Sequence, residues 1–117
     1  MVYGGGNTAV DVARSLVRLG ARPTILYRRR RRDMPAFEHE IAAAEAEGVR
    51  IVELVSPLAI EDNADGATVQ LGRMKTADTD EDGRTRVVPD GDKNTSMTFA
   101  AIYAGIGADV AETWHRP

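Results

Sequence analysis

The sequence contains no cysteine among its 117 residues. Structural disulfides, thiolate metal sites and a redox-active Cys-x-x-Cys pair are therefore excluded within the chain, and this composition is compatible with a reducing cytoplasm. No apolar run approaches the roughly 20 residues that a helix needs to span a bilayer. The net charge of −3 gives the chain as a whole no electrostatic reason to bind nucleic acid or a membrane surface. We therefore expect a cytoplasmic protein that binds neither.

Histidine, the side chain most often used in acid–base and metal chemistry, is also scarce. Histidine occurs only at His39, on the exposed face of a predicted helix, and at His115, near the end of the chain. Neither has a carboxylate and a nucleophile placed to complete a catalytic set. The run from Asp78 to Gly83 resembles the start of a calcium-binding loop, but Pro89 stands where a bidentate Glu is required. We assign no catalytic residue and no metal ligand, and we expect this run to be a solvated hairpin turn.

The residues that are present favour one globular domain. An apolar fraction of 43% and a charged fraction of 28% are ordinary for a domain with a single core. The chain opens with the end of a strand, Val2-Tyr3, and a glycine turn. Apolar residues then recur at helical spacing from Asn7 to Leu19, and Gly20 ends this helix. A strand normally needs about 5–6 residues, so we expect a truncated first strand and a sequence that begins inside a domain.

Two more strands and a second helix follow. Residues 23–27 are β-branched and apolar enough to form a buried strand. The second helix is predicted to begin near Pro35 and to end at Gly48, and residues 49–55 form a third strand. Two successive strand–helix–strand units predict a parallel sheet with right-handed crossovers.

The pattern changes after residue 56. Residues 58–60, 67–74 and 84–88 are short strand candidates separated by turns rich in Asp and Gly, which predicts an inserted antiparallel β-meander. The apolar residues 97–107 would return to the parallel sheet. The predicted fold class is therefore α/β, with a parallel sheet, an inserted meander and no second domain.

The glycine turn has the spacing of a dinucleotide-binding motif. Its sequence is Gly4-Gly5-Gly6-Asn7-Thr8-Ala9, which fits Gly-x-Gly-x-x-Gly/Ala between a strand and a helix. In this motif Gly4 allows the tight turn, Gly6 lets the backbone approach a pyrophosphate, and Ala9 lets the helix press on the strand. The N–H groups at the helix start would hold the phosphates. We therefore predict a Rossmann-like fold in which the cofactor is bound by Gly4, Gly5, Gly6, Asn7 and Thr8.

An arginine run follows the second strand. An NAD-specific site carries an Asp or Glu about 20 residues after the glycine turn, where it accepts a hydrogen bond from the ribose 2′-OH. Arg28 holds this position, and no acid lies between Asp11 and Asp33. An arginine there suits a 2′-phosphate, so we predict that Arg28 and Arg29 select NADPH. For residues 30–32 we expect a solvated run of charges.

Four short strings resemble one protein family. They are residues 4–14, Leu19-Gly20-Ala21, Tyr27-Arg28-Arg29 and Met34-Pro35-Ala36. They look like the NADPH-binding domain of the glutamate synthase small subunit and its relatives, in the pyridine nucleotide-disulfide oxidoreductase superfamily. The match is specific to about residue 56 and loose afterwards. Residues 98–108 depart from the family pattern, because they lack its aspartate and carry a second glycine in Gly105-Ile106-Gly107. The end of the expected nicotinamide pocket lies near these glycines.

The resemblance implies that residues 1–117 are the NAD(P)H-binding part of a larger flavoprotein. NADPH bound here would pass a hydride to an FAD held mainly by a domain absent from this chain. Electrons would continue to iron–sulfur clusters or to a partner like the glutamate synthase large subunit. The isolated chain is then expected to be inactive. By position in the motif, Gly4, Gly6, Asn7 and Thr8 would hold the pyrophosphate, and Arg28 and Arg29 the 2′-phosphate.

Two other function classes are open at this point. A non-catalytic module that senses or stores a dinucleotide would use the same glycine turn. A nucleic-acid binder would use the arginine run, but the net charge and the nearby carboxylates of Asp33, Glu38 and Glu40 disfavour it. Strongly salt-dependent binding to nucleic acid would support that class. Along the first helix, Asp11 and Arg14 are expected to pair with each other at the surface.

Overall fold

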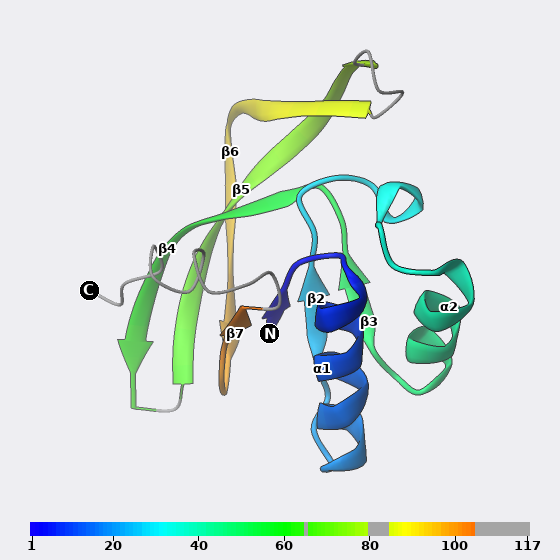
Figure 1. Cartoon of the computed structure of the whole chain (residues 1–117). Helices are drawn as coiled ribbons and strands as arrows, with labels where there is room; N and C mark the ends of the chain where they lie inside the picture. The colour runs from blue at the N-terminus through cyan, green and yellow to red at the C-terminus, as the bar shows by residue number, and fades with distance from the viewer. Residues whose placement is uncertain (65, 80–84, 105–117) are drawn as a thin grey trace.

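Two sheets and two α-helices form the described part of the chain, residues 1–64, 66–79 and 85–104 of the computed structural model (Figure 1). One sheet is parallel with the strand order β3-β2-β1-β7, and the other is antiparallel with the order β4-β5-β6. The elements are β1 (Val2–Tyr3), α1 (Asn7–Arg18), β2 (Thr24–Leu26), the 3-10 turn η1 (Arg31–Asp33), α2 (Glu38–Ala46), β3 (Arg50–Val52), β4 (Val55–Asn63), β5 (Gly66–Thr79), β6 (Thr85–Phe99) and β7 (Tyr103–Ala104).

Strand β1 lies inside the parallel sheet, between β2 and β7. Val2 is in register with Ile25 on one side and with Tyr103 on the other. The antiparallel sheet is inserted in the chain between β3 and β7. This topology confirms the predicted Rossmann-like parallel sheet with an inserted meander and a short first strand.

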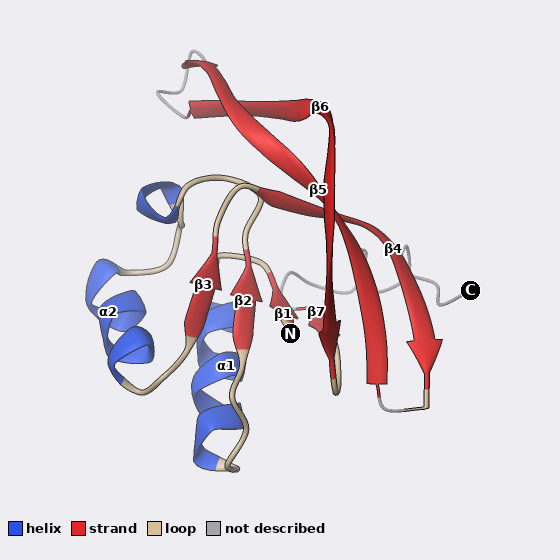
Figure 2. Cartoon of the chain, turned by 180° about the vertical axis from the view of Figure 1, so that it is seen from behind, coloured by secondary structure: helices blue, strands red, loops and turns tan. Residues whose placement is uncertain are grey.

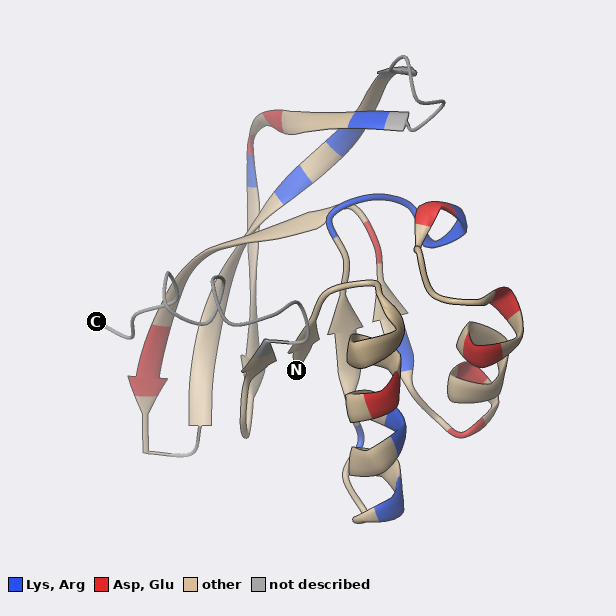
Figure 3. Ribbon diagram, in the orientation of Figure 1, with Lys and Arg blue, Asp and Glu red and all other residues tan. Residues whose placement is uncertain are grey.

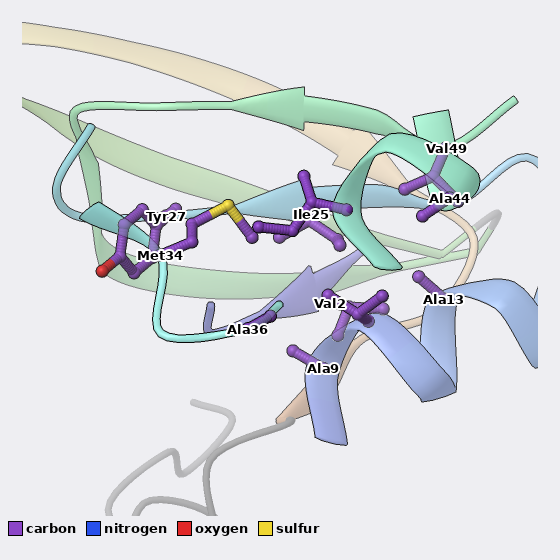
Figure 4. Close-up of a cluster of buried hydrophobic side chains, with 11 residues drawn as sticks. Val2, Ala9, Ala13, Ile25, Tyr27, Met34, Ala36, Ala44 and Val49 are labelled. Atoms are coloured by element: carbon purple, nitrogen blue, oxygen red, sulfur yellow. The ribbon is translucent and has the colours of Figure 1, made fainter. Parts of the chain in front are cut away.

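The two faces of the parallel sheet pack against different layers (Figure 2). Alternate residues of a strand point to opposite faces, so Val2 and Ile25 pack in one core with α1 and α2, whereas Met1 and Leu26 pack in a second core with the meander. On the helix side, α1 and α2 contribute the small residues Ala9, Ala13 and Ala44 to the core, and Figure 4 shows them beside the strands. Ala9 is completely buried. The predicted role of this alanine, close packing of α1 on the sheet, is confirmed.

Helix α2 begins later than its sequence suggests. It starts at Glu38, not near Pro35, because the preceding backbone is committed to other contacts. Met34 and Ala36 are buried in the helix-side core, and the Ala36 N–H donates to the carbonyl of Gly5 at 3.2 Å. Gly48, in the left-handed region at φ +106°, follows the end of the helix as predicted.

The meander strands are longer than predicted, and one assignment was wrong. Residues 97–99 belong to β6, where Met97 pairs with Val69, and only β7 returns to the parallel sheet among the described residues. Met97 and Phe99 are apolar because they pack on the second core. The predicted third strand, residues 49–55, is also divided. Leu54 adopts φ +58° between β3 and β4, and this turn carries the chain from one sheet to the other.

Candidate functional site

The glycine turn and the arginine run meet at the carboxyl edge of the parallel sheet. Strands β1 and β2 run parallel and end side by side, with Tyr3 opposite Leu26. The Gly4 N–H donates to the carbonyl of Leu26 at 3.2 Å, which joins the two strand ends directly. The edge of an open parallel sheet beyond its carboxyl ends is where such folds bind their ligands. The structure therefore brings the two predicted parts of the site together.

The start of α1 is open to a ligand. Gly4 has φ +132°, a conformation that other residues rarely adopt. No atom lies within 4 Å of where a Cβ on Gly6 would stand. The first helical hydrogen bond runs from the Val10 N–H to the Gly6 carbonyl, and the first turn has neither a side-chain cap nor an acidic residue. The N–H groups of this turn, with the positive end of the helix dipole, can therefore hold an anion.

Gly5 and Asn7 contribute contacts that the motif alone did not reveal. A Cβ on Gly5 would collide with the buried ring of Tyr27, whose hydroxyl donates to the carbonyl of Asp33 at 3.0 Å. The side-chain oxygen of Asn7 accepts from the Phe37 N–H at 3.3 Å. Both residues thus fasten the loop between β2 and α2 to the glycine turn, and their contact with the cofactor stays a prediction.

Gly5→Ala should lower the free energy of unfolding by about 1–3 kcal/mol, the usual cost of overpacking a well-filled core. The added methyl group has to displace the Tyr27 ring, which is 8% exposed. Chemical denaturation measures the change. Gly6→Ala is the matched control, because its methyl group enters open space. Equal stability of the two variants would contradict the packing of Gly5 against Tyr27.

Arg28 lies just beyond the end of β2 and is exposed. Burial raises the pKa of the Tyr3 hydroxyl at the end of β1, and the positive charge of Arg28 partly offsets this rise. Arg28 thus interacts electrostatically with the end of β1. Arg28 makes no ion pair with any residue that the structure describes. The carbonyl of Arg29 accepts from the Leu54 N–H at 3.1 Å and fixes the backbone of the run.

Two of the remaining arginines are not a simple solvated run. The Arg31 side chain donates to Glu45 at 2.8 Å and to Glu38 at 3.1 Å, and its backbone N–H donates to Glu53 at 2.7 Å. Arg30 lies 3.9 Å from Glu53. Figure 3 shows the basic loop facing the acidic residues of α2. The prediction was wrong for these two residues, because the fold turns the acids of α2, and Glu53 just after β3, toward them.

Arg14 also pairs differently from the prediction. Its guanidinium lies 2.6 Å from Glu40 and 2.8 Å from Glu47, which joins α1 to α2, and these replace the expected partner Asp11. Sequence spacing could not show this, because the partners lie on another helix.

The meander adds a cavity to the site that sequence reasoning missed. It measures about 370 Å³ and is lined by Arg28 together with residues of all three meander strands. Among them is a further arginine, Arg73 of β5. No local motif marks Arg73, since it stands far from Arg28 in the sequence.

Among the other predicted features, the structure describes His39, which lies on helix α2. His39 has a side chain 77% exposed, as expected, and stacks on Phe37 with ring centroids 5.7 Å apart. Within the described ranges no group of three His, Asp or Glu side chains could hold a metal ion, and no helix is long and apolar enough to cross a membrane. The nicotinamide-pocket end near residues 105–107 lies outside the described residues, as does most of the Asp78 to Gly83 run.

Comparison with known proteins gives consistent matches. The model of the family described as pyridine nucleotide-disulphide oxidoreductase matches residues 1–111. The chain is 47% identical over 90 residues to the β subunit of NADP(+)-dependent formate dehydrogenase from Moorella thermoacetica, over 75% of this chain and 13% of that protein. It is 40% identical over 89 residues to the glutamate synthase [NADPH] small chain of Escherichia coli, over 74% of this chain and 19% of that protein. The resemblance predicted from the sequence is confirmed.

The chain thus spans less than a fifth of the length of these curated relatives. Among solved structures, FprA from Mycobacterium tuberculosis in complex with NADPH has the same fold, with a TM-score of 0.69. The likeness covers 91% of this chain and 38% of that chain at 18% identity, and at this level it shows the fold alone.

Proposed function

Because the chain belongs to the pyridine nucleotide-disulphide oxidoreductase family, we propose that it binds NADPH across the carboxyl ends of β1 and β2 and presents it for hydride transfer to a flavin. The observation that carries the proposal is the open start of α1 beside an arginine without an ion pair in the described chain. The start of α1 suits a pyrophosphate, and Arg28 suits a 2′-phosphate. The hydrogen bond from the Gly4 N–H to the Leu26 carbonyl joins the two strand ends that carry them.

The pyrophosphate end of the site rests on backbone groups. Gly4 turns the chain sharply enough to expose the start of α1, and Gly6 leaves the space above it empty. The N–H groups of Asn7 and Thr8 lie in the first turn, where helical partners are lacking. These donors are fixed by the fold before any ligand arrives, so binding costs little reorganisation.

The 2′-phosphate end of the site rests on Arg28 and Arg29. Guanidinium groups match the geometry of phosphate oxygens and remain charged at any physiological pH. A bare 2′-hydroxyl carries no negative charge for the arginines to pair with. No acidic residue follows β2 directly to accept a hydrogen bond from that hydroxyl. The arrangement therefore favours NADPH over NADH.

The chain itself positions the cofactor and leaves the redox chemistry to the bound groups. When bound, NADPH supplies the hydride and an FAD outside these residues accepts it, since the cofactors carry this chemistry. We propose that the FAD is held mainly by another domain of the same protein. The relatives named above are subunits of larger oxidoreductases, and we propose an iron–sulfur or large-subunit-like partner as the onward electron acceptor.

Anaerobic mixing with NADPH tests the division of labour. The full-length protein should bleach its flavin absorbance on addition of NADPH, because the hydride passes to the flavin. The 117-residue chain alone should bind no FAD and should not oxidise NADPH with an artificial acceptor. Oxidation of NADPH by this chain alone would refute the proposal, because the group that takes the hydride from NADPH would then have to lie within these residues.

A further inference from the structure

The cavity beside Arg28 forms where β6 bends (Figure 1). Gly72 pairs with Asn94, and Met74 pairs with Pro89, so residues 90–93 all lie opposite Arg73. Gly91, within this bulge, has φ +58°. Bulges of this kind bend a strand and re-aim side chains beside functional sites. Here the bulge opens a space on the sheet next to the end of β2.

The floor of the cavity is small and polar. Ser56, Gly72 and Asn94 stand in register across the three strands, so they share one face of the antiparallel sheet. The cavity of about 370 Å³ is roughly tenfold larger than the share of volume of one liquid water, about 30 Å³. Leu58 forms an apolar side and would lie 3.2 Å from a Cβ on Gly72. A polar group with an attached ring can be accommodated here.

The charged groups at the cavity are two arginines and one acid. Arg28 lines it from the loop after β2, Arg73 lines it from β5, and Asp92 lines it from the bulge. Neither arginine has an ion-pair partner in the ranges that the structure describes. By contrast, Arg30 and Arg31 are engaged by acids. The lining of the cavity therefore carries two arginines against one acid, a net positive charge that suits an anion.

We propose that Arg73 completes the 2′-phosphate site and is a specificity-determining residue for NADPH. The proposal rests on the proposed function, since it takes the 2′-phosphate to lie at Arg28. A phosphate monoester carries up to two negative charges and three acceptor oxygens, which can satisfy guanidinium groups from two sides. A 2′-hydroxyl would leave both unpaired. The meander thus takes part in cofactor choice, in addition to covering one face of the sheet.

Calorimetry on the full-length protein, with NADPH and NADH as ligands, tests this proposal. Arg73→Ala should weaken NADPH binding by about 10–100-fold, the loss expected for one charge-assisted contact, and should leave NADH binding unchanged. Asp92→Asn should strengthen NADPH binding by about 2–5-fold, because a repelling charge is removed from the exposed wall. Lys75→Ala is the matched control, since Lys75 is an exposed cation on the same strand that does not line the cavity.

The outcomes separate this proposal from the proposed function. Selective loss of NADPH affinity in Arg73→Ala, with no change in Lys75→Ala, would establish it. If Arg73→Ala behaves like Lys75→Ala while the unmodified protein still prefers NADPH, the proposed role of Arg73 is overturned and the proposed function stands. Equal weakening of NADPH and NADH by Arg73→Ala would also overturn it. A protein without any preference for NADPH would contradict the proposed function itself, and this proposal with it.

Discussion

Replacement of Arg28 and Arg29 together by alanine should erase the preference for NADPH and leave the affinity for NADH nearly unchanged. Charge-assisted hydrogen bonds contribute roughly 1.5–3 kcal/mol each. Two such bonds to a 2′-phosphate correspond to about 10²–10⁴-fold in the ratio of dissociation constants. NADH lacks the phosphate and therefore loses nothing. Titration calorimetry with both cofactors on the full-length protein measures the ratio.

Arg32→Ala is the matched control for this experiment. Arg32 belongs to the same run and is exposed, so its removal changes the net charge without removing a predicted ligand. Its NADPH affinity should stay within a few-fold of that of the unmodified protein, and the difference should shrink further at high salt, where exposed charges are screened. If the double variant loses affinity for NADPH and NADH equally, Arg28 and Arg29 hold a part of the cofactor that both share.

Gly6→Val should abolish the binding of NADPH and NADH alike. Its isopropyl group would occupy the open space at the start of α1, where the pyrophosphate has to approach the backbone. Gly6 itself has φ −84°, which valine adopts without strain, and no protein atom lies within 4 Å of the new Cβ. The fold should therefore tolerate the change, and the loss should be one of binding alone.

Thermal unfolding provides the control for Gly6→Val. The variant should unfold within a few degrees of the unmodified protein, because a residue at the helix N-cap contributes only about 0.5–2 kcal/mol. Gly6→Ala should bind with intermediate affinity, since its methyl group fills less of the space. A folded Gly6→Val protein with normal NADPH affinity would remove the pyrophosphate from this turn.

The sequence was sufficient for the features that depend on local pattern. The apolar, β-branched runs and the strand–helix–strand order predicted the parallel strands, and the glycine spacing predicted the turn that opens α1. Gly4 and Gly48 adopt the left-handed conformations that their positions suggested. Such features depend on residues close together in the chain, so periodicity and turn chemistry report them.

The features that were missed depend on contacts between distant segments. The late start of α2 follows from the bond between Ala36 and Gly5, and the position of Arg14 follows from acids on α2. The role of Arg73 depends on a bulge in β6. None of these partners stands at a fixed spacing in the sequence. The candidate site was therefore predictable along β1 and β2, and its meander wall was not.

Strand β2 has a consequence for how the molecule unfolds. Ile25 is completely buried against the helices, and its neighbour Leu26 is completely buried against the meander. A single extended segment is thus a shared wall of two separate cores, and neither core can lose it without exposing the other to water. The helical layer and the antiparallel layer should therefore melt as one cooperative unit. The amides of β2 should exchange with solvent only through global opening, and so report the stability of the whole domain.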